Sequence, residues 1–336
     1  MNDILVIGGG SWGTAFADYL ARREEKVRLW VREAEVLEAI NFTHENKVFL
    51  PGIELASGLE AHADLEAAAA DAAVLVLAVP SKYVRSVMLR LRGAWREGQV
   101  MVNLSKGFES DSLKTISQVA AEIFGPGITP HWLTLSGPSF ARELAEQHPT
   151  AVVAAAEDGD LVRRLQGRFS SAILRVYRSS DLRGLEVAGA LKNVMAIAAG
   201  MVSGLGYGFN TTASLVTRAN MEISRLGVRL GARPETFWGL AGIGDLMLTC
   251  FGSLSRNVQL GRRIAQGESL AEAERATPMV AEGVETAKAV SRLAEQLAVE
   301  MPISREVHRV LFEGKAVREA VTDLMTRRLK EEWNTN

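Results

Sequence analysis

The sequence predicts an α/β domain that is followed by an all-helical domain. Two observations carry this prediction. Short strand-like apolar runs alternate with helical patterns up to about residue 181, and from there on the periodicity is almost wholly helical. A chain of 336 residues is long for one domain and comfortable for two. We therefore expect a first domain at residues 1–181 and a second at residues 182–336.

Composition excludes several classes of function. The 38 basic and 40 acidic residues leave a formal charge of -2, so no global field attracts nucleic acid or an anionic membrane. Cys250 is the only cysteine and the five histidines are scattered, so no disulfide and no metal site is expected. The N-terminus lacks a signal-peptide pattern, and the longest apolar run is short for a membrane span. We expect a cytoplasmic protein without an integral membrane segment.

The first segment has a strand–turn–helix pattern. Ile4 to Ile7 is a β-branched run, and an alanine-rich helical pattern follows from Thr14 to Arg22. Between them, Gly8, Gly10 and Gly13 satisfy the spacing G-x-G-x-x-G. The first glycine permits the tight turn, the second lets a pyrophosphate approach the backbone, and the third lets the helix pack on the strand. The motif favours a Rossmann-type, dinucleotide-binding domain over a plain glycine turn.

The second expected strand, Val27 to Val31, ends at a residue that bears on cofactor choice. Arg32 stands where an NAD-preferring site usually has an acid for the ribose hydroxyls. Because an arginine can accept a 2′-phosphate, NADP(H) is the preferred cofactor, while the neighbouring Glu33 leaves NAD(H) use open. The alternative is an exposed arginine at a strand end.

Further strands complete the predicted sheet. They are expected at Val74–Val79, Val100–Leu104, Trp132–Leu135, Ala151–Ala156 and Ile173–Tyr177. Polar residues at the strand ends line the crevice at the carboxyl edge of such sheets, so Lys106 is a candidate ligand group, against the alternative of a solvated loop lysine. Ser139 is expected to cap a helix over Phe140 to Gln147.

The second domain contains an unusual lysine. The apolar run from Glu186 to Val202 carries Lys192 and Asn193 in its middle. A helix that is apolar on all sides is a buried helix, and a buried ammonium is costly unless it is paired or loses its proton. Lys192 is therefore a candidate for chemistry; alternatively it reaches the surface, or pairs with a buried carboxylate in a purely structural role. Asp245, in a glycine-rich stretch, is the candidate partner.

A polar cluster further along suits an anion. Ser255 is expected to cap a helix, with Arg256 and Asn257 in its first turn. A hydroxyl, a guanidinium and an amide at a helix N-terminus can bind a phosphate, and they accept a carboxylate as well. The structural alternative for each residue is a cap or a surface ion pair.

Two further residues stand outside this cluster. Glu282 is expected where a loop leads into a helix, and Cys250 is expected to be a core thiol.

Together these segments resemble the bacterial type of NAD(P)-dependent glycerol-3-phosphate dehydrogenase, nearly end to end. The resemblance rests on Gly8–Ala15, Leu104–Gly107, Ser136–Ala141, Ala190–Val194, Gly239–Cys250, Leu254–Asn257 and Val280–Gly283. It implies a Rossmann-type domain followed by an all-helical domain, with the active site between them. It also implies reversible hydride transfer between NAD(P)H and C2 of dihydroxyacetone phosphate, giving sn-glycerol 3-phosphate for phospholipid synthesis.

The resemblance further implies roles for single residues. Lys192 matches the family's proton donor and acceptor. The residues implied to contact the cofactor are Ser11, Trp12, Arg32, Ala141, Val280 and Glu282. Those implied to surround the phosphorylated substrate are Lys106, Gly137, Ser139, Asp245, Ser255, Arg256 and Asn257, of which Lys106 and Arg256 would lie near both ligands. Thr212 and Val258 depart from the family pattern, which usually has a lysine and an arginine at these places.

Two alternatives stay open at this point. A dehydrogenase of the same architecture that acts on a 3-hydroxy acid would bind the cofactor in the same way. A catalytically silent NADPH-binding sensor or scaffold would bind without turnover, although the combination of Lys192 with Asp245 argues against it. The sequence does not fix the oligomeric state, and a homodimer is compatible with it.

Overall fold

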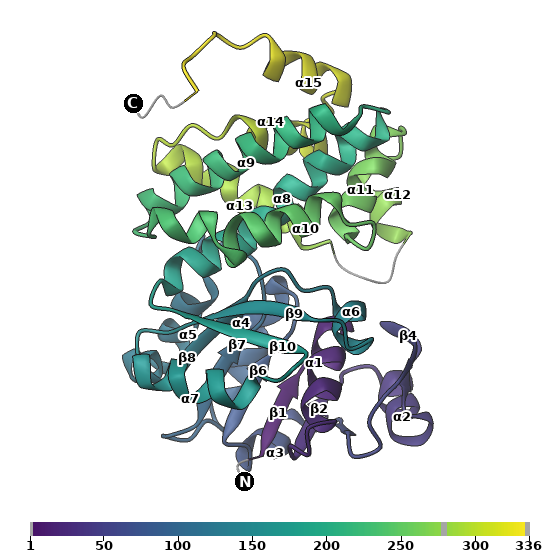
Figure 1. Cartoon of the computed structure of the whole chain (residues 1–336), viewed down its shortest axis with the longest axis vertical. Coiled ribbons are helices and arrows are strands. Elements are labelled where there is room, and N and C mark those ends of the chain that lie inside the picture. The colour runs from purple at the N-terminus through teal and green to yellow at the C-terminus, as the bar shows by residue number, and fades with distance from the viewer. Residues whose placement is uncertain (1–2, 277–280, 333–336) are drawn as a thin grey trace.

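The computed structural model describes residues 3–276 and 281–332, and it has a sheet-containing part and a helical part (Figure 1). The strands of the first part are β1 (Ile4–Ile7), β2 (Val27–Trp30), β5 (Glu60–His62), β6 (Val74–Leu77), β7 (Val100–Asn103), β8 (Trp132–Ser136), β9 (Thr150–Ala155) and β10 (Leu174–Ser179). They form one sheet in the order β10-β9-β8-β7-β6-β1-β2-β5. Neighbouring strands are parallel except β8 and β9.

The strand order is that of a doubly wound dinucleotide-binding sheet. From β5 to β8 the strands follow the order 3-2-1-4-5-6 of this fold, and the direction of winding reverses between β1 and β6. A separate antiparallel pair, β3 (Glu45–Asn46) and β4 (Leu50–Glu54), lies outside the sheet. The predicted α/β class with a Rossmann-type first domain is confirmed.

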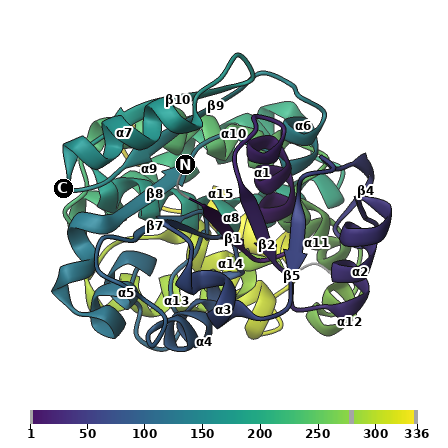
Figure 2. The same ribbon diagram turned by 90° about the horizontal axis from the view of Figure 1, so that it is seen from below.

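Helices cover both faces of the sheet because its strands are apolar on both sides. The helices are α1 (Ser11–Ala21), α2 (Ala34–Thr43), α3 (Leu65–Ala70), α4 (Ser81–Leu91), α5 (Ile116–Phe124), α6 (Ala141–Ala145) and α7 (Gly159–Phe169). Ile4 and Val6 of β1 face the core under α1 and α7, whereas Leu5 and Ile7 face α3, α4 and α5. Figure 2 shows these two layers on opposite sides of the strands.

The second part is all-helical among the described residues. Its helices are α8 (Leu182–Gly204), α9 (Phe209–Arg229), α10 (Asp245–Phe251), α11 (Arg256–Ala265), α12 (Leu270–Arg275), α13 (Glu282–Gln296), α14 (Pro302–Phe312) and α15 (Val317–Met325). Helix α8 is at their centre and packs against α9, α10, α11, α13 and α14. Every residue of α8 from Gly184 to Val202 is buried, as the apolar run predicts. Its length and composition would suit a membrane span, but its apolar window lies entirely inside the protein.

Helix α8 also reaches into the sheet-containing part. The carboxylate of Glu186 accepts hydrogen bonds from the backbone N–H of Ser117 at 3.0 Å and from the hydroxyl of Thr134 at 3.2 Å. The first turns of α8 therefore pack against the sheet-containing part, and the rest of the helix packs within the helical part. The domain boundary at residue 181 stays a prediction.

Two glycines let α8 and α11 approach backbone to backbone. A Cβ on Gly261 would lie 2.1 Å from the carbonyl oxygen of Ile197, and one on Gly200 would lie 2.1 Å from that of Val258. Such distances leave no room for a methyl group. The close approach of these helices therefore requires both glycines.

We expect Gly261→Ala to lower the free energy of unfolding by at least about 1–3 kcal/mol, because the added methyl group overpacks the core. Urea denaturation monitored by circular dichroism measures this change. Gly167→Ala is the matched control: Gly167 is exposed in α7 with no atom within 4 Å of the new Cβ, so this change should be neutral or stabilising by up to about 1 kcal/mol. A Gly261 variant as stable as this control would contradict the close packing.

Candidate active site

The glycine turn between β1 and α1 has the geometry of a dinucleotide site. Gly8 has a φ of 122°, and a Cβ there would lie 2.6 Å from the carbonyl oxygen of Ala78, just after β6. A Cβ on Gly13 would lie 2.0 Å from the carbonyl oxygen of Gly8, so α1 packs directly on the turn. Gly10, in contrast, has no atom within 4 Å of its Cβ position.

The open side of Gly10 faces the start of α1, where no side chain caps the helix. The first N–H groups of α1 can therefore bind an anion such as a pyrophosphate. These residues fit a dinucleotide cofactor.

Other residues assigned to the cofactor lie around this turn. The Arg32 side chain is 62% exposed, forms an ion pair with Glu33 and lies over the ring of Tyr83, with 5.3 Å from Cζ to the ring centroid. Trp12 is on α1, and Ala141 begins α6, which packs against α1. The hydroxyl of Ser11 donates to the carbonyl oxygen of Phe49 at 2.7 Å. Val280 lies outside the described residues.

The lysine of α8 is paired inside the protein. Its Nζ lies 2.6 Å from Oδ1 of Asp245, which is only 1% exposed, and it also donates to the Thr249 hydroxyl at 2.9 Å. The predicted partner of Lys192 is therefore correct, and the alternative in which Lys192 reaches the surface is wrong. The reason is that neighbouring helices surround α8, so only 10% of the Lys192 side chain is exposed.

A second ammonium binds the same carboxylate. Lys106, in the loop after β7, places its Nζ 2.7 Å from Oδ2 of Asp245 and 3.4 Å from the carbonyl oxygen of Gly137. One buried carboxylate thus joins Lys106 of the sheet-containing part to Lys192 of the helical part. This junction lies at the carboxyl edge of the sheet, the edge on which the glycine turn also lies.

The charges at this junction shift the pKa values of Lys192 and Asp245. Burial lowers the pKa of Lys192 to about 8; Asp245 opposes this shift, and the nearby Lys106 adds to it. Burial alone would raise the pKa of Asp245, but the two lysines lower it. Asp245 therefore stays ionised at neutral pH. Lys192 is then mostly protonated and gives up its proton far more readily than an ordinary lysine.

Local backbone structure places Asp245 at this point. The residues Leu240–Gly244 form a π-helical turn that leads directly into α10, whose first residue is Asp245. Such turns are frequent at functional sites. Thr249, one turn along α10, donates to the carbonyl oxygen of Asp245 and accepts from Lys192. Sequence reasoning missed Thr249, although its four-residue spacing from Asp245 would have indicated it.

In the expected anion cluster, Ser255 and Asn257 form hydrogen bonds within the protein, whereas the guanidinium of Arg256 forms none with the described residues. Ser255 caps α11 as predicted, because its hydroxyl accepts from the N–H of Val258. Asn257 is buried and joins the side chain of Asn193 at 3.1 Å to the N–H of Gly283 at 3.0 Å. Arg256 is exposed, and its guanidinium has no hydrogen bond or ion pair to any residue that the structure describes. Arg256 is therefore the member of the cluster that is free to bind a ligand.

One predicted cap is wrong. Helix α6 covers only Ala141–Ala145, its N-cap residue is Phe140, and no side chain caps it. The hydroxyl of Ser139 instead donates back to the carbonyl oxygen of Gly137 at 3.0 Å. Because the same carbonyl also faces the ammonium of Lys106, Gly137 and Ser139 lie next to the charged group rather than serving α6.

Glu282 is a further charged group near these lysines. It begins α13, as predicted, and lies 3.4 Å from the side-chain nitrogen of Asn193. Burial raises the pKa of this carboxyl, while the charges of Arg256, Lys106 and Lys192 oppose the shift. The carboxyl therefore lies within electrostatic reach of three cations that come from different elements.

The two departures from the family pattern lie elsewhere. Val258 is 2% exposed in the core between α11 and α8, where its backbone meets Gly200. The hydroxyl of Thr212 donates to the carbonyl oxygen of Gly208 in the first turn of α9. Cys250 is buried, and burial raises the pKa of its thiol to about 12, so it is a core residue as expected.

Comparison with known proteins covers nearly the whole chain. The family model of the NAD-dependent glycerol-3-phosphate dehydrogenase N-terminus matches residues 3–162, and that of the C-terminus matches residues 181–322. A glycerol-3-phosphate dehydrogenase [NAD(P)+] of Geobacter sulfurreducens is 50% identical over 329 residues, 98% of each chain.

Solved structures agree with these matches. The crystal structure of glycerol-3-phosphate dehydrogenase from Coxiella burnetii has 34% identity and a TM-score of 0.93, and the match covers 97% of this chain and 99% of that one. A D-mandelate dehydrogenase, at 14% identity and a TM-score of 0.63, shares the fold alone.

The buried ion pair can be tested by stability. We expect Asp245→Asn to lower the free energy of unfolding by roughly 3 kcal/mol, because Lys192 loses its counter-charge and must either stay buried as an unpaired ammonium or release its proton. In Lys192→Met with Asp245→Asn the buried amine of α8 is gone and only Lys106 has lost its partner, so the double variant should lose clearly less than the sum of the two single variants. Urea denaturation of the three variants measures this coupling, and strictly additive losses would contradict it.

Proposed function

Since the chain belongs to the NAD-dependent glycerol-3-phosphate dehydrogenase family, we propose that it transfers a hydride reversibly between NAD(P)H and C2 of dihydroxyacetone phosphate, giving sn-glycerol 3-phosphate. The observation that carries the proposal is the buried ammonium of Lys192. It is paired with Asp245 at 2.6 Å, beside Lys106 at the edge of the sheet where a dinucleotide would bind.

Lys192 is the proposed acid. Reduction of a ketone needs a hydride donor at the carbonyl carbon and an acid near the carbonyl oxygen, which gains negative charge as the hydride arrives. The bound nicotinamide would supply the hydride. Lys192 would protonate the oxygen, and in the reverse reaction its neutral amine would remove the proton from the hydroxyl. A pKa of about 8 suits both roles, because either protonation state is accessible near neutral pH.

The other charged groups would bind and orient the substrate. Arg256 and the N-terminal amides of α11 would hold the phosphate, while the buried Ser255 and Asn257 fix the start of this helix. Lys106, beside Gly137 and Ser139, would lie between the phosphate and the reacting carbon and would stabilise negative charge there. Asp245 would keep both lysines in place without a direct part in proton transfer.

The preferred cofactor is proposed to be NADP(H), with NAD(H) also used. Arg32 is exposed directly after β2, where its guanidinium can bind a 2′-phosphate. The ion pair with Glu33 competes for the same guanidinium, which is why the preference is expected to be moderate. Trp12, Ala141 and Glu282 are assigned to cofactor contact on the resemblance, and so is Val280.

We also propose a cellular role for this activity. The product would serve as the precursor of glycerophospholipids, and the enzyme would act in the cytoplasm, alone or as a homodimer. Residues 1–181 would bind the cofactor, and residues 182–336 would supply Lys192 and the phosphate site.

The decisive experiment is a spectrophotometric assay with dihydroxyacetone phosphate and either reduced cofactor. Loss of absorbance at 340 nm supports the proposal, and its absence with both cofactors would refute it. Oxidation assays that compare glycerol 3-phosphate with 3-hydroxy acids separate the alternative dehydrogenase. A silent NADPH-binding protein would bind the cofactor in the same preparation without turnover.

Lys192→Ala is expected to lower turnover by about two to four orders of magnitude, because the positioned acid is lost, while the Kd for NADPH changes little. In the wild type, kcat/KM for reduction should fall as pH rises through about 8, where Lys192 loses its proton. Oxidation should show the opposite dependence, and the variant should show neither. Lys288→Ala, at an exposed lysine of α13, is the control. Unchanged turnover in Lys192→Ala would remove this residue from the mechanism.

Arg32→Gln is expected to reduce kcat/KM for NADPH by roughly 10- to 100-fold, since charged hydrogen bonds to the 2′-phosphate are lost. The value for NADH should stay close to that of the wild type. Arg92→Gln, at an exposed arginine after α4, provides the control for a general loss of charge. An equal decrease in kcat/KM with both cofactors would show that Arg32 does not bind the 2′-phosphate.

A further inference from the structure

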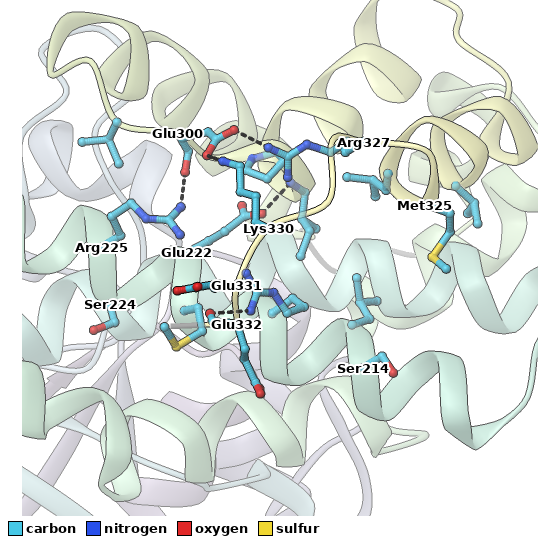
Figure 3. A pocket seen from close by; sticks show the side chains of 18 of the residues that line it. Ser214, Glu222, Ser224, Arg225, Glu300, Met325, Arg327, Lys330, Glu331 and Glu332 are labelled. Carbon is cyan, nitrogen blue, oxygen red and sulfur yellow. Dashed lines mark hydrogen bonds and ion pairs between the residues drawn. The ribbon is translucent and has the colours of Figure 1, made fainter. Parts of the chain in front are cut away.

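A large cavity lies in the helical part, away from the residues assigned to catalysis. It has a volume of about 1050 Å³ and is bounded by α9, the start of α14, α15 and the C-terminal segment that follows α15 (Figure 3). None of the substrate or cofactor residues proposed above lines it. Its size is that of cavities that bind small organic molecules.

The walls of the cavity are mainly apolar. They include Leu215, Met221 and Val228 of α9, Ile303 of α14 and Leu324 of α15. Val228 is 45% exposed and Met325, at the end of α15, is 77% exposed. Apolar side chains of the cavity wall are therefore in contact with water, and a bound ligand could cover them. An apolar chain would gain free energy by leaving water for these walls.

Three arginines of α9 line the same cavity. Arg218, Arg225 and Arg229 are seven and four residues apart, which places them on one face of the helix. Arg218 donates to the main-chain carbonyl oxygen of Glu332, and Arg225 donates to that of Glu300. These carbonyl groups are uncharged, so neither hydrogen bond neutralises an arginine. Among the residues that the structure describes, no carboxylate forms an ion pair with any of the three.

The remaining charged groups leave this side of the cavity positive. Arg327 and Lys330 share the single carboxylate of Glu300. Glu222 lies in the floor, where its carboxylate accepts from the N–H groups of Ile303 at 2.7 Å and Ser304 at 3.3 Å. Burial raises its pKa to about 7, so it carries only part of its charge at neutral pH. Glu331 and Glu332 form no ion pair with the α9 arginines among the described residues.

We propose that this cavity is a second ligand site, which binds an amphiphile with one acyl chain and an anionic head group. The acyl chain lies along the apolar wall of α9, and the head group is held by Arg225 and Arg229, whose guanidinium groups can bind a carboxylate or a phosphate with two parallel hydrogen bonds. The proposal rests on the lining and the charges of the cavity alone, so it does not depend on the catalytic function proposed above.

Isothermal titration calorimetry on the full chain tests the site with four amphiphiles of equal chain length, each below its critical micelle concentration. Dodecanoate and dodecyl phosphate are expected to bind at one site per chain, and their relative affinities distinguish a carboxylate from a phosphate head. Dodecanol and dodecyltrimethylammonium should bind at least about tenfold more weakly, because they cannot pair with guanidinium groups. Equal binding of all four would overturn the proposal.

Variants localise the binding. Arg225→Gln and Arg229→Gln should each weaken binding of the two anions about tenfold without affecting dodecanol, and Val228→Trp should weaken binding of all chains because its ring occupies part of the apolar wall. Arg318→Gln, an exposed arginine of α15 outside the cavity, is the matched control. Unchanged affinity in the two α9 variants would refute the assignment. So would a wild-type dimer that Val228→Trp converts to a monomer in analytical ultracentrifugation, since this face would then belong to a second copy of the chain.

Discussion

The buried carboxylate of Asp245 determines how the rest of the site is arranged. A lone ammonium on α8 would lose its proton, and a lone carboxylate at the start of α10 would gain one, because burial disfavours both charges. At the junction, the single carboxylate of Asp245 pairs with the two ammonium groups of Lys192 and Lys106, so the formal positive charges exceed the negative charge by one. This surplus is what an anionic substrate and a growing oxyanion require, so the same interaction that stabilises the junction prepares it for ketone reduction.

The position of Lys192 is fixed from both ends of α8. Six residues before it, Glu186 is bound to the sheet-containing part through Ser117 and Thr134. Eight residues after it, Gly200 brings the helix into backbone contact with α11. A side chain held between two such contacts has little freedom, which favours a well-defined distance between an acid and a substrate atom. The apolar character of α8 thus has a purpose beyond core formation.

The fold and the site differ in how far the sequence predicts them. Apolar runs and glycine spacing predict the main strands, the turn at Gly8 and the buried helix, because these depend on neighbours close in the chain. The partner of Lys192 could be proposed from charge alone, but the second lysine on Asp245 could not, since the contact spans 139 positions. The cap by Ser139 failed for a related reason: a hydroxyl can turn to any nearby carbonyl, and local pattern does not say which.

Helix α9 shows why a sequence pattern can mislead about surfaces. Its arginines and serines, read alone, indicate a solvated helix face. In the folded chain, Glu300 binds Arg327 and Lys330 and so holds the C-terminal segment across that face, which turns a surface into the wall of a cavity. Helix α8 is enclosed by five helices at contact distance. Helix α9 is instead crossed by the polar C-terminal segment after α15, which does not fill the space beneath it. Segments distant in sequence therefore create the hollow, and the charges of α9 give it a preference for anions.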